Sequence, residues 1–202
     1  SVFKLITTSI ALDAGVTSLD DTFTCGGFLY VADRKLRCWN YPKAHGKEDL
    51  SKAVANSCNV AMMHLVSRMG RETFYAGLEA FGLLEKTGVD FPGEAKNLIV
   101  SEKNAGPVEL ATMSYGQGIA LSPLSITNAV CAIANGGYLL EPHIVKEICD
   151  SEGNVVESYG RTVKSIAITS QTSADVRQIM EYVVYNGGGG KAKVAGYRVG
   201  GK

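Results

Sequence analysis

The chain opens with SVFKLITTSIALDAG (residues 1–15), a stretch whose pattern predicts a helix. Apolar residues recur at the spacing of one helix face, at Phe3, Ile6 and Ile10. Gly15 is suited to end this helix, because glycine readily adopts the left-handed conformation found after a helix end. Ser1 and Lys4 are three positions apart and therefore share a helix face. We expect their hydroxyl and amine to meet.

This pair has the composition of a nucleophile and its base. A serine hydroxyl is a weak nucleophile at neutral pH, and a nearby amine can take its proton if burial lowers the pKa of that amine. The beginning of a helix also offers free backbone N–H groups, which favour developing negative charge. A capping serine followed by a surface lysine would give the same letters, so the motif alone leaves both interpretations open.

Two further motifs contain residues of the same chemical kind. SCN at residues 57–59 falls between two predicted helices, where a turn can aim a hydroxyl and a carboxamide into a cleft. GGK at residues 200–202 has two glycines, which permit close approach of another segment, and a lysine that can attract a carboxylate. Taken singly, the first is equally a helix break capped by Asn59 and the second a flexible terminus.

The rest of the pattern is mostly helical. We expect helices at residues 47–57, 59–70, 71–82, 106–116, 122–137 and 172–188, the last one capped by Thr172. Residues 143–160 alternate around DSEGN and predict a β-hairpin, whereas residues 16–46 are expected to be rich in loops. Residues 195–202 have the pattern of a chain entering a strand. The expected strands and helices do not alternate along the chain, so the pattern does not indicate a doubly wound sheet.

Composition excludes several classes of function. Hydrophobic residues make up 46% and charged residues 20%, which suits a folded globular chain rather than a disordered one. The formal net charge is zero, which gives no electrostatic reason to expect nucleic acid as a partner. The longest apolar stretches are too short to span a bilayer.

The cysteines do not suggest a metal site by their spacing. None forms a CxxC pair, and His45, His64 and His143 are not at zinc-ligand spacing from them. We therefore expect no metal and no cofactor. An odd number of cysteines fits a reduced protein or one disulfide with spare thiols, and leaves the compartment open.

Together, and in this order, SxxK, SxN and a final lysine resemble the motifs of the penicillin-binding protein transpeptidase family. The stretches AFGLLEKTGVDFPGEA (residues 80–95), MSYGQGIALSPLSITNAVCAIANGGYLLEPHIV (residues 113–145) and IMEYVVYNGGGGKAKVAGYRVGGK (residues 179–202) are similar to class B members. The resemblance runs over residues 1–202, which we interpret as one partial transpeptidase domain. It implies an α+β fold, of which this chain holds mostly the helical part, a β-hairpin and little of the central antiparallel sheet.

The resemblance also implies a role for each motif residue. Ser1 would be the acylated nucleophile and Lys4 its general base. Ser57 would relay protons, Asn59 would orient the substrate, and Lys202 would be the lysine of the third motif, KTG. The implied reaction is D,D-transpeptidation: attack on the D-Ala-D-Ala amide of a peptidoglycan stem peptide, followed by cross-linking. β-Lactams mimic that amide and would block Ser1.

Partners and location follow from the same resemblance. The implied partners are stem peptides, β-lactam antibiotics and a membrane glycosyltransferase. The implied place is the outer face of the bacterial cytoplasmic membrane, with an N-terminal anchor outside this chain and a role in division, elongation or sporulation. A serine β-lactamase or a non-enzymatic penicillin-sensing receptor domain are the alternatives, because both share the motifs.

The chain departs from the family pattern at its end. The Thr and Gly of the third motif do not follow Lys202, and the family takes one of its two oxyanion-hole N–H donors from that strand. Loss of one such donor typically costs about a hundredfold or more in rate. We therefore expect residues 1–202 alone to be inactive and poorly folded.

A complete KTG occurs elsewhere, at residues 86–88. We reject it as catalytic, because it follows a predicted helix end at Gly82 and leads into the turn-forming VDFPGE. The third motif of the family must lie on a strand edge beside the serine. Lys202 fits this requirement better than Lys86, because it follows the strand-like YRV.

Cys58 is the unusual residue of the SCN motif. Cys38 lies in the loop-rich segment that precedes it, and our hypothesis is that Cys38 and Cys58 form a redox pair whose disulfide would distort or lock the site. Two independent thiols are the equally weighted alternative. Cysteine at this position is also similar to the sporulation-specific class B proteins.

Overall fold

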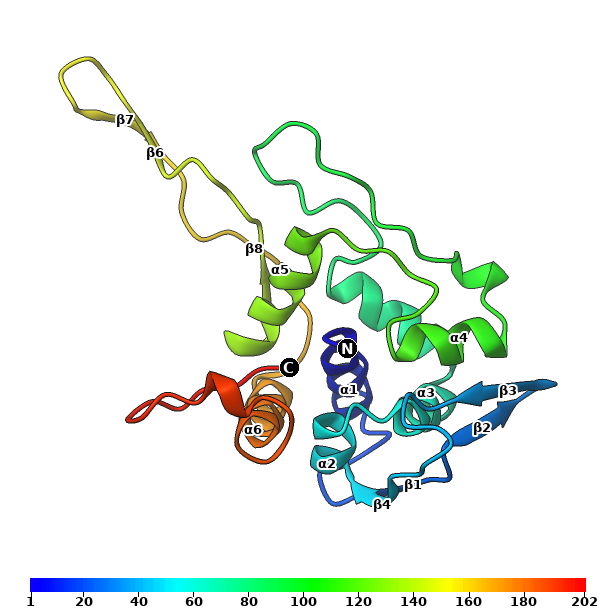
Figure 1. The fold of residues 1–202 in the computed structure, drawn as a ribbon. Helices are drawn as coiled ribbons and strands as arrows, with labels where there is room; N and C mark the ends of the chain where they lie inside the picture. Colours follow the sequence, from blue (N-terminus) through cyan, green and yellow to red (C-terminus); the bar gives the residue numbers. More distant parts are fainter.

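In the computed structural model, which describes residues 1–202, helix α1 (Phe3–Asp13) is surrounded by other helices (Figure 1). Every residue from Phe3 to Ala11 is buried, so the polar side chains of this helix need internal partners. Thr7 donates a hydrogen bond to the Ser114 carbonyl at 2.7 Å, and Ser9 donates to its own helix. A helix buried on all sides belongs in the centre of a core, and α1 is that centre.

The predicted helices are present with shifted ends. They are α2 (Leu50–Ala55), α3 (Asn59–Ala80), α4 (Pro107–Ser114), α5 (Pro123–Ala134) and α6 (Ser170–Asn186), with single 3₁₀ turns η1 (Glu102–Asn104) and η2 (Gly190–Ala192). The two helices expected on either side of Gly70 form α3, which Gly70 interrupts with φ 75° and ψ 174°. No helix combines the length and apolar character that crossing a bilayer requires.

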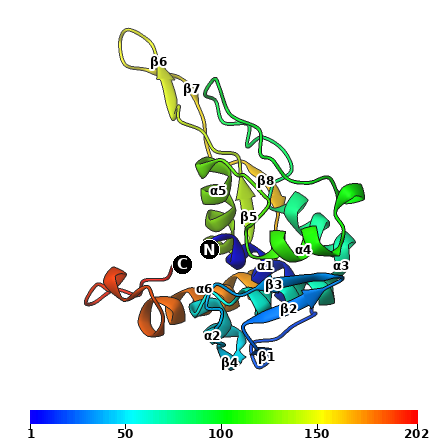
Figure 2. The same ribbon diagram turned by 45° about the vertical axis from the view of Figure 1, so that its right-hand side comes forward.

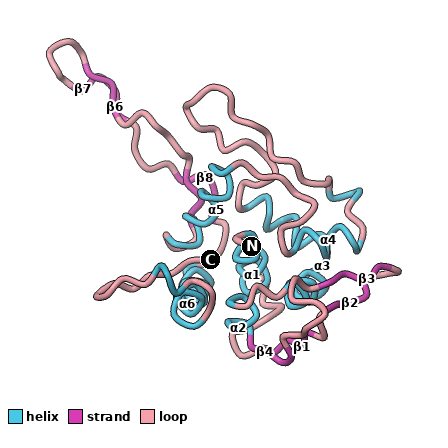
Figure 3. The backbone as a smooth tube through the Cα atoms, in the orientation of Figure 1, coloured by secondary structure: helices cyan, strands magenta, loops and turns pink.

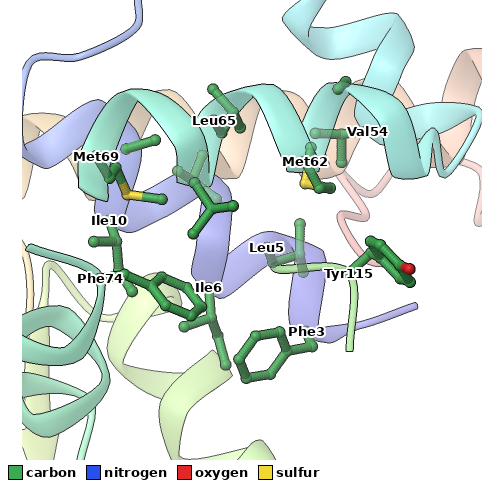
Figure 4. Close-up of a cluster of buried hydrophobic side chains, with 14 of the residues drawn as sticks. Phe3, Leu5, Ile6, Ile10, Val54, Met62, Leu65, Met69, Phe74 and Tyr115 are labelled. Carbon is green, nitrogen blue, oxygen red and sulfur yellow. The ribbon is translucent and has the colours of Figure 1, made fainter. Parts of the chain in front are cut away.

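The hydrophobic core holds α1 in place. Figure 4 shows side chains of α1 packed against α3, with Phe74 and Met69 beside Ile6 and Ile10. Burial of one such side chain contributes roughly 1.5–3 kcal/mol. The helix that carries Lys4 is therefore held in place by its packing inside this core.

The segment expected to be rich in loops, residues 16–46, contains three short strands and the first residue of a fourth, whose other residues, 47–49, lie where a helix was expected to begin; both are corrections. Strand β1 (Thr22–Cys25) pairs antiparallel with β4 (Gly46–Asp49), and β2 (Phe28–Val31) forms a hairpin with β3 (Arg34–Arg37). Figure 3 shows them as short separate pairs. Glycines, aromatic residues and a proline dominate this segment, and strands of four residues are too short for a clear alternating pattern.

The second half of the chain adds two more strand pairs. The predicted hairpin at residues 143–160 is confirmed by β6 (Glu147–Cys149) and β7 (Val155–Ser158), which project from the body in Figures 1 and 2. Strand β5 (Tyr138–Leu140) pairs with β8 (Val163–Ile166). The chain forms four two-stranded sheets in all, which agrees with an α+β fold that has little of a central sheet.

Two local expectations were wrong. Thr169 rather than Thr172 caps α6, because the Thr169 side chain accepts a hydrogen bond from the Thr172 N–H. Residues 195–202 form no strand, because no neighbouring strand offers them a ladder. The Gly201 N–H instead donates to the Met180 carbonyl of α6 at 3.1 Å.

Candidate active site

Ser1 and Lys4 lie at the beginning of α1, as the spacing predicted. Ser1 is exposed to solvent, whereas Lys4 is only 4% exposed and lies in the core. Lys4 projects beside the ring of Tyr115, with Nζ 5.9 Å from its centroid. The buried helix thereby carries an amine that cannot be fully hydrated.

The SCN turn between α2 and α3 brings a second hydroxyl to this pair. Ser57 has φ 57°, in the left-handed region that residues other than glycine rarely adopt. Its Oγ lies 3.1 Å from Ser1 Oγ and accepts a hydrogen bond from Lys4 Nζ, also at 3.1 Å. Two hydroxyls and one amine from separate segments thus form a continuous hydrogen-bonded row.

The environment of Lys4 favours its neutral form. Burial, followed by repulsion from the Lys202 charge, lowers the pKa of Lys4 to about 8, against a partial opposing effect of Cys38 and Cys58. An appreciable fraction of the amine is therefore unprotonated near neutral pH. A neutral amine that reaches a serine hydroxyl can act as a general base.

Asn59 follows Ser57 by two residues, and Lys202 contacts the chain just before Ser57. Asn59 is the first residue of α3 and is 7% exposed, and its Nδ2 donates to the Arg37 carbonyl at 3.4 Å. Lys202 Nζ donates to the Ala55 carbonyl at 3.3 Å, two residues before Ser57. Burial lowers the pKa of Lys202. The two ends of the chain lie side by side in Figures 1 and 2, so the three motifs meet in space.

Of the two glycines before Lys202, Gly200 permits the close approach that the sequence suggested, whereas Gly201 has open space around it. A Cβ on Gly200 would lie 3.1 Å from Met180 Cβ and 3.3 Å from the Glu181 nitrogen. A side chain at this position would therefore push the C-terminal segment away from α6.

The second KTG lies in a loop rather than on a strand. The carboxylate of Glu94 accepts the N–H groups of Thr87 and Gly88 at 2.6 and 3.1 Å. The backbone donors of this motif are thereby occupied within their own loop.

Residues that the sequence interpretation did not assign to the site also contact it. Gly116 has φ 87°, and a Cβ there would lie 3.1 Å from Phe3 Cβ and 4.0 Å from the Ser1 nitrogen. Tyr115, which faces Lys4, precedes it. In the sequence, GQG at residues 116–118 contributed only to the family resemblance. Two glycines on either side of one residue also indicate a tight turn, and this signal could have drawn attention to the segment.

The cysteine next to Ser57 does not lie alone. Cys25, Cys38, Cys58 and His45 gather with their ligand-type atoms all within 4.8 Å of one another. A hydrogen bond from the Cys58 thiol lowers the pKa of Cys38, and donating that bond raises the pKa of Cys58. The linear spacing, which gave no zinc-ligand pattern, did not indicate that His45 lies beside these cysteines. Linear spacing missed it because strand pairing makes the contact.

The family model for the penicillin binding protein transpeptidase domain matches residues 1–202. The chain belongs to this transpeptidase family. The α+β fold and the order of the three motifs agree with that assignment.

Relatives and solved structures of this family match over the whole chain. Stage V sporulation protein D of Bacillus subtilis is 38% identical over 204 residues, which cover 100% of this chain and 31% of that protein. The D,D-transpeptidase domain of a peptidoglycan glycosyltransferase from Eggerthella lenta has a TM-score of 0.89 at 27% identity, covering 100% of this chain and 52% of the other. Penicillin binding protein 3 of Mycobacterium tuberculosis complexed with ampicillin has a TM-score of 0.84 at 27% identity, covering 99% and 42%. The chain spans about a third of the length of the Bacillus relative.

Proposed function

We propose that the intact protein containing this chain is a serine D,D-transpeptidase that cross-links peptidoglycan stem peptides. The observation that carries the proposal is the hydrogen-bonded row of Ser1, Ser57 and Lys4, with links of 3.1 Å each. The family and the names of its relatives support the same reaction. Residues 1–202 are then one part of the transpeptidase domain.

In the acylation step Ser1 Oγ attacks the carbonyl carbon between the two terminal D-alanines. Lys4 takes the hydroxyl proton, directly or through Ser57 Oγ, with which both groups are in contact. The proton passes to the nitrogen of the leaving D-alanine, and an ester joins the remaining peptide to Ser1. The Lys202 ammonium attracts the terminal carboxylate.

In the second step the ester is opened by an amine of another stem peptide. Lys4 receives a proton from that amine and returns it to Ser1 Oγ, so the free serine and a new amide bond result. Asn59 orients the peptide, because its Nδ2 is already held by Arg37 and its Oδ1 is left to accept a substrate N–H. The same geometry would accept ampicillin as a substitute for the D-Ala-D-Ala amide.

The test is acylation of the intact protein by ampicillin, located by peptide mass spectrometry. We expect one label on Ser1, no label in Ser1→Ala, and full labelling of the control Ser18→Ala, whose hydroxyl contacts only Asp21. Stem peptides should give cross-linked dimers. Rapid hydrolysis of the acyl-enzyme would indicate a β-lactamase, and labelling without any cross-linked product would indicate a receptor. Either result would contradict the proposal.

We further propose that the intact protein acts at the outer face of the cytoplasmic membrane beside a membrane glycosyltransferase. Peptidoglycan stem peptides are the proposed substrates there. Protease accessibility in spheroplasts and co-purification from detergent extracts would test both points. The inactivity expected of residues 1–202 alone stays a prediction.

Cys38 and Cys58 remain our proposed redox pair. Their sulfur atoms lie within 4.8 Å, so side-chain rotation could bring them to the roughly 2.05 Å of a disulfide. Exchange with an exogenous disulfide would join them and leave that reagent as two thiols. After treatment with oxidised glutathione, peptide mass spectrometry of the non-reduced protein should therefore find Cys38 and Cys58 joined to each other, whereas the exposed Cys131 and Cys149 should carry glutathione or remain free.

A further inference from the structure

Three cysteines and one histidine meet beside the SCN turn, and the transpeptidase mechanism uses none of them. Cys25, Cys38 and Cys58 are each at most 2% exposed, and the side chain of His45 is 7% exposed. All four ligand-type atoms lie within 4.8 Å of one another. Buried thiols grouped with an imidazole are the usual composition of a structural zinc site.

The paired strands β1 and β4 place two of these side chains together. Cys25 is the last residue of β1, and its partner in the ladder is Gly46, the first residue of β4. His45 directly precedes Gly46. The register of one short sheet therefore aligns a thiol with an imidazole.

The other two thiols come from the β2–β3 hairpin and from α3. Cys38 follows the hairpin, and its N–H donates to the Gly27 carbonyl at 2.8 Å, which returns the chain beside Cys25. Cys58 is the N-cap of α3, and the N–H of the next residue, Asn59, donates to Cys38 Sγ at 3.4 Å. Three separate segments thus converge on one point.

The distances suit a tetrahedral ion. Zinc binds sulfur at about 2.3 Å and nitrogen at about 2.0–2.1 Å, so ligand atoms of a tetrahedral site lie roughly 3.6–3.8 Å apart. Cys38 Sγ and His45 Nδ1 are 3.6 Å apart, and no pair exceeds 4.8 Å. Shifts of about 1 Å or less would complete the site. Three sulfurs and one nitrogen favour zinc over magnesium or calcium, which prefer oxygen.

A buried carboxylate lies next to the histidine of the cluster. Glu48 Oε2 is buried and has no hydrogen-bond partner, and it lies 4.0 Å from His45 Nδ1. The other carboxylate oxygen, Glu48 Oε1, accepts a hydrogen bond from Asn56 Nδ2. A metal-bound imidazole is commonly oriented by a neighbouring carboxylate, and Glu48 lies in position to orient His45 in this way.

We propose that Cys25, Cys38, Cys58 and His45 bind one structural zinc ion that fixes the SCN turn. Cys58 lies between Ser57 and Asn59 in the chain, so an ion bound to its sulfur restrains both neighbours. The left-handed conformation of Ser57 is strained for a residue other than glycine, and bonds to a metal are a means of holding it. The ion is structural and takes no part in the bond-making steps.

The first experiment measures metal in the intact protein, purified from zinc-sufficient medium without chelator. We expect about one zinc per chain, with an X-ray absorption shell of three sulfurs at about 2.3 Å and one nitrogen at about 2.0–2.1 Å. A protein without stoichiometric zinc, or a shell of nitrogen and oxygen only, would overturn the proposal. This readout is independent of transpeptidase activity, so the two proposals can fail separately.

Variants then assign the ligands. Cys25→Ser and His45→Gln should each lose at least about nine tenths of the zinc, whereas Cys131→Ser and Cys149→Ser, which change exposed thiols, should retain it. If both ligand variants stay folded and keep a full equivalent of zinc, the assignment is wrong. If either fails to fold, the unmodified protein decides: p-hydroxymercuribenzoate should release its zinc to a metallochromic dye, and failure to do so would exclude thiolate ligands.

The zinc site and the proposed Cys38–Cys58 disulfide exclude one another, since both use the same sulfur atoms. Formation of that disulfide should therefore release the ion stoichiometrically. Zinc retained in full after quantitative pairing of these two thiols would overturn the ligand set.

Discussion

Ser57 combines a catalytic hydroxyl with a strained backbone, and these two properties can be separated by mutation. Its φ of 57° costs an alanine roughly 1–2 kcal/mol but costs a glycine almost nothing. We predict that Ser57→Ala and Ser57→Gly both slow ampicillin acylation of the intact protein by about a hundredfold or more. Ser57→Gly should nevertheless unfold at a higher temperature than Ser57→Ala.

The matched control is Ser67, which is exposed in the regular part of α3. There the order of stability should reverse, because alanine is favoured over glycine in a helix by about 1 kcal/mol. Thermal unfolding measures both pairs. Equal stability of the two Ser57 variants would show that the turn relaxes when the hydroxyl is removed.

Lys4 predicts the pH dependence of acylation. Its pKa of about 8 means that the neutral base is depleted roughly tenfold for each pH unit below that value. The acylation rate should rise up to about pH 8 and then level, before falling as Lys202, whose pKa burial also lowers, loses its charge. Because the folded protein disfavours the Lys4 proton, the Lys4 contribution to stability increases from about pH 8 toward the ordinary 10.5.

Single-turnover acylation from pH 6 to 10 measures this profile. Lys4→Gln should abolish the rising limb, whereas Lys52→Gln, on the surface of α2, should leave it unchanged. A flat profile between pH 6 and 8 would contradict a base role for Lys4.

At the residue scale the sequence was sufficient for the three motifs but not for the metal ligands. Ser1 and Lys4 depend on helix spacing alone, and the remaining motif residues followed from the family resemblance. Cys25 and His45 become neighbours only through the β1–β4 register, and that pair of strands gave no readable alternation. The proposed zinc ligands were therefore missed because the pairing of β1 with β4 was not predicted.

At the element scale, α3 contains two glycines, and each is required there for a different physical reason. Gly70 adopts φ 75° and ψ 174°, and a Cβ there would meet no other atom within 4 Å. A substitution at Gly70 is therefore opposed by its backbone conformation and not by a lack of space. Gly77 is helical, but a Cβ there would lie 2.6 Å from atoms of Ile10 on α1. We predict that Gly70→Ala costs about 1–3 kcal/mol through backbone strain and Gly77→Ala a similar amount through overpacking.

A double-mutant cycle with Ile10→Ala distinguishes these two causes. Removing the Ile10 side chain should cancel most of the Gly77→Ala loss, whereas the Gly70→Ala loss should add within about 0.5 kcal/mol. Denaturant unfolding gives the free energies. Equal coupling of both glycines to Ile10 would refute the assignment.

Helix boundaries were predictable only where punctuating residues mark them. Gly70, Pro107 and Pro123 lie where the pattern placed a break or a beginning. The cap of α6 was misplaced from Thr169 to Thr172, because both threonines precede the same apolar pattern and only the observed hydrogen bond chooses between them.

At the scale of the whole molecule, the site is built where the two chain ends meet over a buried helix. α1 contacts α3, α4, α5 and α6, so the Ser1–Lys4 pair is positioned by the entire core rather than by a loop. The strand pairs lie outside that arrangement, and they differ in how they join it. β2–β3 packs Leu29, Val31 and Leu36 against the core, whereas every residue of β6 and β7 is exposed.

This difference predicts opposite outcomes for shortening the two hairpins. Replacing residues 147–158 by Asn-Gly keeps the Tyr159 N–H to Lys146 carbonyl bond that closes the hairpin at 2.8 Å. The melting temperature of the intact protein should change by no more than about 2–4 °C, and ampicillin acylation should be unaffected. Replacing residues 29–36 in the same way removes apolar contacts worth several kcal/mol and should lower the melting temperature by about 5 °C or more. A large loss from the first replacement would mean that the β6–β7 hairpin packs against residues outside 1–202, and that its exposed Ile148 and Val156 are part of an interface in the intact protein.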